Sequence, residues 1–390
     1  MTTQKPTLGI GLIGTGFMGK CHALAFRAAP AVFAHLPRLD LAVLADVDAG
    51  HAGEAAHAFG FSRATDDWQG LVDDPAVDIV AITAPNFLHQ EMALKAIAAG
   101  KHVYCEKPLS LDAKGAATMT EAAEKAGVKT LVGYNYLHNP AIRLAKDIID
   151  SGEIGEIIHF RGTHFEDYLA NPNAPYTWRS SKAKAGAGVV ADLGSHAISL
   201  ARRLVGEIAS VQAMLEIVVK DRPLADDPGE RRPVEVDDQA QMLLRFKDGP
   251  TGTIEASAVA AGRKMHLAFE IAGSKGTLAF DQERMNELRL FSFLEGDPPR
   301  GGAPSREGFK TILSGPTHPP YDAFCPAPGH GLGFNDLKVI EVAHLIEGIA
   351  EQKTLDPDFR GAWQIAEVVD AAIRSDASRS WTEVEQVGRA

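Results

Sequence analysis

The segment Gly14-Thr15-Gly16-Phe17-Met18-Gly19 constrains the fold more than any other part of this chain. It follows a short apolar run at residues 8–13 and precedes a helical pattern, a context that is typical of a dinucleotide-binding βαβ unit. We expect Gly14 to form the tight turn, Gly16 to admit a pyrophosphate, and Gly19 to let the helix pack on the strand. The helix N-terminus, at Phe17 and Met18, would then offer its free N–H groups to the phosphates.

The first third of the chain alternates apolar runs with helical patterns, which predicts parallel strands joined by helices. We therefore expect a Rossmann dinucleotide-binding domain over residues 1–134, and an α/β class for the protein. The first helix should stop near Pro30, because proline removes a helical hydrogen bond. The expected strands are 8–13, 41–45, 77–83, 102–105 and 130–133, and the expected helices are 17–29, 50–59, 87–99 and 112–126.

The remaining residues, 135–390, have the pattern of an α+β domain. Turn signals such as Asp248-Gly249 separate several strands, which predicts a mostly antiparallel sheet with helices on one face. Two segments rich in turn-forming residues, 167–188 and 295–333, are expected to be loops. The expected strands are 154–165, 208–219, 237–247, 251–261, 264–272, 277–280 and 287–293, and the expected helices begin at Pro140 and cover 190–205, 334–351 and 360–375.

Composition excludes several classes of partner. The 390 residues carry a formal net charge of -12 without a lysine-arginine run, which argues against nucleic acid. No run of roughly 18 apolar residues predicts a membrane span. The three cysteines, Cys21, Cys105 and Cys325, are far apart and form no CxxC pair, so a reducing cytosol is expected. With no signal-peptide pattern at the N-terminus, we expect a cytoplasmic protein.

Asp46 is the candidate for recognising the cofactor, because it ends the second apolar run. An acidic residue there accepts hydrogen bonds from the adenosine ribose and repels a 2′-phosphate, which predicts NAD rather than NADP. Asp46 lies 27 residues after Gly19 instead of the usual ~20, and a loop insertion over residues 29–38 accounts for the excess. Asp48 is the alternative acid, but it is placed to cap the following helix.

Three residues form a candidate catalytic set. Lys107, in Glu106-Lys107-Pro108, follows a strand at the edge where open α/β sheets bind ligands, although alone it could be a structural turn. Asp192 and His196 are four residues apart, which on a helix places both on one face; alone, that pair could simply stabilise a helix. Together they suit alcohol oxidation, with NAD as hydride acceptor, His196 as proton acceptor and Lys107 as the cation beside the alkoxide.

No metal-ligand spacing is evident, so a metal-independent enzyme is expected. The other histidines of the first half and of the first strand of the second half are scattered along the sequence. They are expected on helix surfaces or strand faces: His51, His57, His102, His159 and His164.

In this order, GTGFMG, Asp46, Thr83-Ala84-Pro85-Asn86, Glu106-Lys107-Pro108 and Asp192-x-x-x-His196 resemble the glucose–fructose oxidoreductase / inositol dehydrogenase (Gfo/Idh/MocA) family. The resemblance covers essentially the whole chain. It implies a Rossmann domain followed by an α+β domain with an open, mainly antiparallel sheet. It also implies a homodimer or homotetramer, since the family often uses that sheet for subunit contacts.

The resemblance also assigns roles to individual residues. It makes Lys107 the catalytic lysine, His196 the acid/base and Asp192 its partner in the substrate pocket. It implies a cis Lys107–Pro108 bond. Trp178 and Arg179 could stack on a sugar ring or the cofactor and bind its oxygens, or could instead anchor a buried loop. The remaining implied contacts are Ala84, Pro85, Asn86 and His89 near the nicotinamide, Glu106 on a cofactor ribose, Asn135 facing the nicotinamide, and Asn135 and Tyr136 beside the substrate.

The implied activity is oxidation of a secondary hydroxyl of a cyclic sugar or polyol. Segments such as Pro85-Asn86-Phe87-Leu88-His89 and Gly315-Pro316-Thr317-His318-Pro319 resemble a dehydrogenase that oxidises the anhydrosugar levoglucosan at C3 with NAD. One departure is Leu137-His138, where relatives commonly place an arginine. Two alternatives remain: a myo- or scyllo-inositol dehydrogenase, and a non-catalytic NAD-binding sensor. The complete Lys/Asp/His set argues against the sensor.

Overall fold

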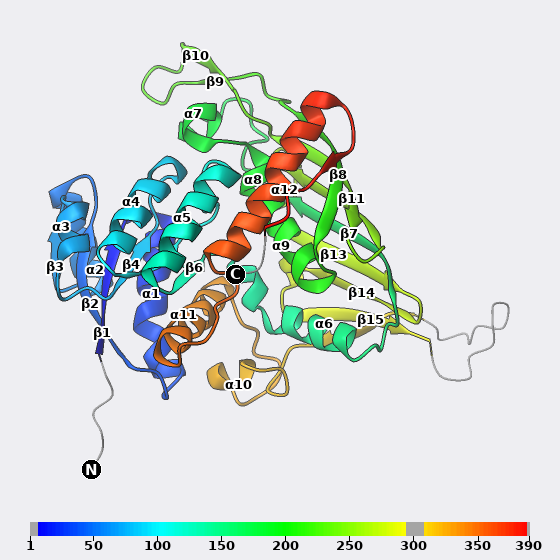
Figure 1. The fold of residues 1–390 in the computed structure, drawn as a ribbon, viewed down its shortest axis with the longest axis horizontal. Coiled ribbons are helices and arrows are strands. Elements are labelled where there is room, and N and C mark those ends of the chain that lie inside the picture. The colour runs from blue at the N-terminus through cyan, green and yellow to red at the C-terminus, as the bar shows by residue number, and fades with distance from the viewer. Residues whose placement is uncertain (1–6, 294–307, 388–390) are drawn as a thin grey trace.

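The structure is a computed structural model that describes residues 7–293 and 308–387. Two sheets lie side by side, with the parallel sheet of the first half at the left of Figure 1. Its strand order is β3-β2-β1-β4-β5-β6. The order reverses between β1 and β4, so their carboxyl ends flank the crevice where open α/β sheets bind ligands. The strands are β1 (Thr7–Ile13), β2 (Arg38–Ala45), β3 (Arg63–Thr65), β4 (Ile79–Ile82), β5 (His102–Cys105) and β6 (Thr130–Val132).

The predicted Rossmann fold is confirmed, with two local differences. Helix α1 continues through Pro30 to Val32, so the predicted stop was wrong. Pro30 lies in the last turn, so the one helical hydrogen bond that it cannot make is lost near the end of the helix, which still buries Phe26 and Ala29. The elements β3 and α3 were not predicted. The helices are α1 (Phe17–Val32), α2 (Ala49–Phe59), α3 (Trp68–Asp73), α4 (Asn86–Ala98) and α5 (Ala113–Ala126).

The second half contains a nine-stranded sheet in the order β16-β15-β14-β13-β7-β12-β11-β8-β17. Neighbouring strands are antiparallel except β7 and β12, which confirms the mostly antiparallel prediction. A separate hairpin of β9 (Asp221–Pro223) and β10 (Arg231–Pro233) was not predicted. The sheet strands are β7 (Ile157–Phe165), β8 (Ile208–Glu216), β11 (Gln239–Phe246), β12 (Thr251–Ser257), β13 (His266–Gly273), β14 (Gly276–Asp281), β15 (Glu287–Ser292), β16 (Lys310–Leu313) and β17 (Thr382–Glu383).

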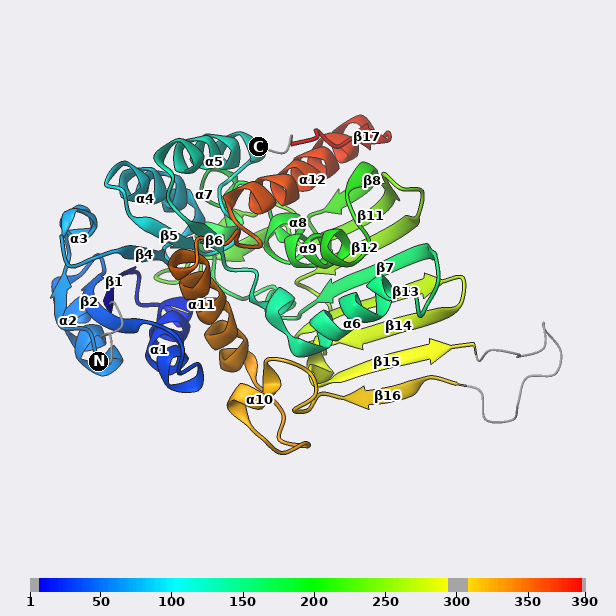
Figure 2. The ribbon, with the colours of Figure 1, turned by 60° about the horizontal axis from the view of Figure 1, so that its bottom comes forward.

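Helices cover one face of the large sheet, as Figure 2 shows. The strand residues on that face, such as Phe160, Ile254 and Leu267, are fully buried. The covering helices are α6 (Pro140–Asp150), α8 (Val189–Asp192), α9 (Gly194–Leu204) and α12 (Phe359–Ser378). Short helical segments in the loops are η1 (Asn135–His138), η2 (Trp178–Ser180), α7 (Lys182–Ala185), η3 (Gln282–Arg284) and α10 (Tyr321–Phe324).

Helix α11 (Phe334–Ala350) comes late in the chain but packs against α1 of the first half. Its Leu337 and Leu345 share one apolar cluster with Ile10 and Phe26. The second half of the chain thus supplies one of the layers over the Rossmann sheet. The domain boundary at residue 134 stays a prediction. Helix α11 comes after this boundary in the sequence but packs on the domain before it.

Residues 295–333 were predicted to form a loop. Only residues 308–333 of this segment can be compared with the structure, because residues 294–307 lie outside the described ones. Within 308–333 the prediction was wrong in two places, β16 and α10. Strand β16 pairs with β15 at the sheet edge, and Tyr321 of α10 is fully buried. Among the described residues, no helix combines the length and apolar character that crossing a membrane requires.

Candidate active site

The glycine loop has the geometry of a phosphate-binding turn. Gly14 has a φ of +100°, a conformation that side chains rarely adopt. A Cβ on Gly19 would lie 2.2 Å from the Gly14 carbonyl oxygen, so only glycine lets α1 approach β1 this closely. A Cβ on Gly16 would meet no atom within 4 Å, which leaves open space in front of the loop. The N-terminus of α1 faces that space, and Phe17 there stacks on Phe334 with ring centroids 5.7 Å apart.

Asp46 lies beside this loop, at the end of β2. Its Oδ2 accepts hydrogen bonds from the Thr15 backbone N–H at 2.9 Å and from the Thr15 hydroxyl. Its Oδ1 accepts from the Val47 N–H at 2.7 Å. These bonds fix the carboxylate at the mouth of the crevice, where a ribose next to the pyrophosphate would lie. Asp48 instead caps α2 through the His51 N–H, as expected for the alternative acid.

Lys107 and Asp192 meet across the two halves of the chain. The Lys107 ammonium donates to Asp192 Oδ1 at 2.6 Å and to the Asp192 carbonyl oxygen at 2.8 Å. The Lys107–Pro108 bond is cis, as the resemblance implies. Burial raises the pKa of Asp192, but the Lys107 ammonium outweighs burial and holds that pKa well below its usual range. The pair is thus charged, with a cation available at the cleft.

Asp192 and His196 lie on two helices rather than the single predicted helix over 190–205. Helix α8 ends at Asp192, and α9 begins at Gly194. At the break, the Leu193 carbonyl oxygen accepts from His164 Nδ1 at 2.9 Å, and the Asp192 carbonyl oxygen accepts from the Lys107 ammonium at 2.8 Å. The Asp192 carboxylate contacts Lys107 and the Tyr168 hydroxyl, the latter at 2.9 Å. Both carboxylate oxygens therefore have partners other than the His196 ring.

His196 is buried, with 4% of its surface exposed. Its ring lies between Tyr136, at a centroid distance of 4.8 Å, and Tyr134, at 5.5 Å. Burial, Lys107 and His164 hold the pKa of His196 well below its usual range. Its Nδ1 has no hydrogen-bond partner among the described residues. The lowered pKa favours the neutral imidazole, which is the form that can accept a proton.

His164 and Tyr168 were missed as site residues. His164 was predicted on a strand face, yet it is buried with its ring 5.5 Å from that of His196. Its Nε2 lies 3.1 Å from Glu166 Oε1. The signal for His164 was its place on the inward side of a long strand. Tyr168 lies in a loop without periodicity, so no pattern in the sequence pointed to it.

The predicted nicotinamide-side residues are grouped at the end of β4. Pro85 precedes α4, and Asn86 begins it. His89 is buried one turn on, with its ring nitrogens 2.9 Å from the Pro108 carbonyl oxygen and 2.8 Å from the Ala84 carbonyl oxygen. His89 therefore connects the β4 turn to the turn that carries Lys107. A direct contact between His89 and the cofactor stays a prediction.

Asn135 and Tyr136 lie on η1, directly after β6. Asn135 is 3% exposed, and its Nδ2 has no partner among the described residues. Tyr136 packs on His196 and places its hydroxyl 3.7 Å from Met265 Sδ. An unpartnered buried amide fits a site that holds a polar ligand.

Trp178 and Arg179 border a cavity of ≈ 520 Å³, counted with its opening to solvent. Asn86, Tyr168 and Asp192 line the same cavity. The Arg179 guanidinium lies over the Trp178 ring at 4.4 Å. This arrangement agrees with the cleft-facing alternative for the pair, while their contacts with a sugar or cofactor stay predictions.

Glu106 is directed into the protein. It is 5% exposed, and its Oε1 accepts from Lys338 Nζ at 2.6 Å and from His22 Nε2 at 2.7 Å. Its Oε2 accepts from the Lys107 N–H at 3.2 Å. The predicted contact with a cofactor ribose stays a prediction, and Lys338 and His22 were not expected here.

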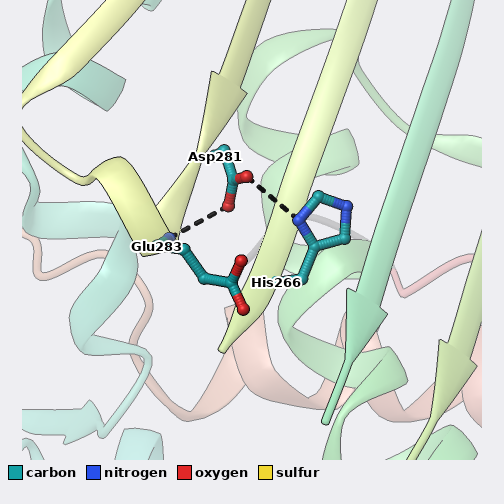
Figure 3. A group of neighbouring side chains, drawn as sticks. All are labelled: His266, Asp281 and Glu283. Atoms are coloured by element: carbon teal, nitrogen blue, oxygen red, sulfur yellow. Dashed lines mark hydrogen bonds and ion pairs between the residues drawn. The ribbon is translucent and has the colours of Figure 1, made fainter. Parts of the chain in front are cut away.

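One group of metal-ligand type occurs among the described residues: His266, Asp281 and Glu283 (Figure 3). Protein groups already engage these atoms. His266 Nδ1 lies 3.1 Å from Asp281 Oδ2, and Glu283 Oε1 accepts from the Lys264 N–H at 2.9 Å. Glu283 Oε2 accepts from Arg263 at 3.1 Å. The three side chains therefore stabilise the loop before β13, and their ligand atoms are already used by other protein groups.

Two family models match the chain. "Oxidoreductase family, NAD-binding Rossmann fold" matches residues 8–134, and "GFO/IDH/MocA C-terminal domain" matches residues 142–279. The chain belongs to the GFO/IDH/MocA oxidoreductase family, and its cofactor is NAD. The open space at Gly16 and the unpartnered Asn135 amide fit such a group.

Known relatives match most or nearly all of the chain. Levoglucosan dehydrogenase of Pseudarthrobacter phenanthrenivorans is 39% identical over 97% of this chain and 99% of that protein. A solved structure of levoglucosan dehydrogenase with NADH and levoglucosan superposes with a TM-score of 0.93 at 39% identity, over 98% of this chain and 100% of that chain. Myo-inositol 2-dehydrogenase of Thermotoga maritima is 30% identical over 72% of this chain and 77% of that protein.

Proposed function

We propose that this protein oxidises a secondary hydroxyl of a cyclic sugar, with a levoglucosan-like anhydrosugar and its C3 hydroxyl as the first candidate. The observation that carries the proposal is the Lys107–Asp192 ion pair of 2.6 Å near the buried ring of His196. Cation and base come from different halves of the chain and meet at the carboxyl end of β5. The similarity to levoglucosan dehydrogenase supports the anhydrosugar as the substrate class.

Each residue has a task in this proposal. When bound, NAD supplies the acceptor for the hydride, at nicotinamide C4. Lys107 donates to the reacting hydroxyl oxygen and stabilises the negative charge that develops there. His196 accepts the hydroxyl proton, and Asp192 keeps the Lys107 ammonium at the cleft. Asn135, Tyr136 and Arg179 would orient the sugar.

The remaining assignments also form part of the proposal. Asn86 and the turn at Ala84 and Pro85 would border the nicotinamide, with Trp178 across the cavity. We propose the domains as residues 1–134 and 135–390, with α11 packed on the first. We further propose a cytoplasmic homodimer or homotetramer.

A substrate panel tests the proposal. With NAD in excess, the absorbance of NADH at 340 nm is expected to rise with levoglucosan and to rise at least about tenfold more slowly with myo- or scyllo-inositol. Inositol dehydrogenase is the second candidate, because a 30% identical relative carries that activity. Faster turnover of a cyclitol than of levoglucosan would identify the protein as an inositol dehydrogenase instead. No turnover with any sugar or cyclitol, together with tight NADH binding, would favour the non-catalytic sensor.

Cofactor choice provides a second test. The wild-type protein is expected to prefer NAD over NADP by at least about tenfold in kcat/KM, because the Asp46 carboxylate repels a 2′-phosphate. Asp46→Ser should reduce that preference. Asp48→Ser is the matched control, since Asp48 caps α2, serine is an equally good N-cap, and the change should not alter the ratio. Equal kcat/KM values for the two cofactors in the wild type would refute the role of Asp46.

A further inference from the structure

A cluster of charged side chains lies buried behind the turn that carries Lys107. At its centre is Lys338 of α11, which is fully buried. The Lys338 ammonium donates to Glu106 at 2.6 Å, to Glu341 Oε2 at 2.8 Å and to the Tyr104 hydroxyl at 3.2 Å. Its three N–H donors are therefore all used. No group of the proposed mechanism requires this lysine, and yet it lies two contacts from Lys107.

The contacts form a continuous path. Lys338 holds Glu106 Oε1, and Glu106 Oε2 accepts from the Lys107 backbone N–H at 3.2 Å. Lys107 then reaches Asp192 with its ammonium. The space around Glu106 is closely fitted, because a Cβ on Gly133 would lie 2.7 Å from its Oε1. A displacement of the Glu106 carboxylate would therefore be transmitted to the backbone of Lys107.

Lys338 also balances charge. A buried carboxylate is costly unless it is paired. Burial raises the pKa of Glu106, but Lys338 outweighs burial and, together with His22, holds that pKa well below its usual range. Several titratable groups interact electrostatically with Glu106. They are Cys21 and His22 of α1, His89 of α4, Tyr104 and Cys105 of β5, Tyr134 and Tyr136 at η1, His196 of α9, and Lys338 and Glu341 of α11. Burial lowers the pKa of His22 to about 4, so Lys338 is the cation of the group near neutral pH.

We propose that Lys338 is a positioning residue for the oxidation: from α11 its ammonium holds the Glu106 carboxylate, which in turn holds the backbone of Lys107. This proposal rests on one part of the proposed function, namely that Lys107 acts on the reacting oxygen. The site would thus depend on α11, a helix near the end of the chain. Its Lys338 is fully buried behind the turn and does not itself border the cleft.

Kinetics of Lys338→Met provide the test. We expect kcat at pH 7 to fall by at least about tenfold, with the KM for the sugar changed less than about threefold. Without its cation, Glu106 takes up a proton at a higher pH. The variant should therefore show an acid limb, in which kcat rises with pH, at a higher pH than the acid limb of the wild type. Lys146→Met, which removes a surface lysine from α6, is the matched control and should behave like the wild type.

The double variant Glu106→Gln/Lys338→Met separates positioning from general damage. It removes both buried charges, and the amide oxygen of the introduced glutamine can still accept from the Lys107 N–H. We expect kcat within about threefold of the wild type and no acid limb from residue 106. Glu341, whose pKa burial raises to about 7, is present in every variant, so the difference between the single and double variants isolates Glu106.

Two results would overturn the proposal: wild-type kcat and pH profile in Lys338→Met, or a folded double variant with less than about 1% of wild-type kcat. The second applies even if Lys338→Met fails to fold. If the wild type oxidises no sugar, the proposed function has failed instead. Crystal structures of the wild type and of Lys338→Met would then still test the positioning role. If Lys338 fixes the turn, the distance from Lys107 Nζ to Asp192 Oδ1 should be longer than 2.6 Å in the variant, and otherwise it should be unchanged.

Discussion

Substitution of Lys107 by methionine is expected to lower kcat by about 10²–10³-fold or more, because in the proposed mechanism it removes the cation that donates to the reacting oxygen. The Lys107 ammonium is held at 2.6 Å from Asp192 Oδ1, with its side chain 17% exposed. In so sheltered a place a cation stabilises a developing alkoxide far better than water does. The measurement is NADH formation at 340 nm with the substrate found in the panel.

Binding of NADH should be nearly unchanged in Lys107→Met, as followed by quenching of tryptophan fluorescence. The glycine loop and Asp46, which are proposed to hold the pyrophosphate and the adenosine ribose, are untouched by the change. Lys95→Met is the matched control, because it removes a surface lysine of the same domain that pairs with Asp73. Turnover within about tenfold of the wild type would remove Lys107 from the chemistry.

Substitution of His196 by glutamine is the change with the second largest expected effect. Removal of a general base costs about 10²–10⁴-fold in kcat. The residual rate should rise steadily with pH, because the proton must then pass to water or hydroxide. A variant with the wild-type rate and pH profile would assign the proton to another group.

The pH profile of the wild type follows from the same residue. Burial, Lys107 and His164 lower the pKa of His196, and the proton-accepting form is the neutral ring, so activity should fall on acidification only well below pH 6.5. In Lys107→Met the remaining activity should have its acid limb closer to neutral pH, because the cation that lowers this pKa is absent. An unchanged limb would contradict the coupling between the two residues.

The sequence predicted well those parts of the fold whose strands, helices and turns each have a clear local pattern. Each strand of the parallel sheet is a short apolar run, and glycines mark the turn after β1. Lys107 and Asp46 could be predicted because parallel strands end at a common edge, where their following residues gather. Asp192 and His196 were found from their spacing, although the helix that the spacing suggested is broken at Leu193.

The residues that were missed depend on long-range contacts. His164 donates to the carbonyl oxygen at the helix break from a strand 29 residues away in sequence, and no local pattern records that bond. Tyr168 lies in a loop without periodicity. Lys338 and Glu341 resemble the solvated face of a helix, whereas both are fully buried because α11 packs between α1 and the turn at Glu106.

The place of α11 has a consequence for how the protein is made. Residue 134, the end of the proposed first domain, is synthesised roughly 200 residues before Phe334, the first residue of α11. Until then, the apolar side chains of α1 that α11 will cover face water, and Glu106 has no ammonium beside it. The nascent domain is therefore incomplete both in its core and in its charge balance. Completion of the cofactor domain is thus a late event in synthesis, and the last helices of the chain decide when the enzyme can first bind and turn over its substrate.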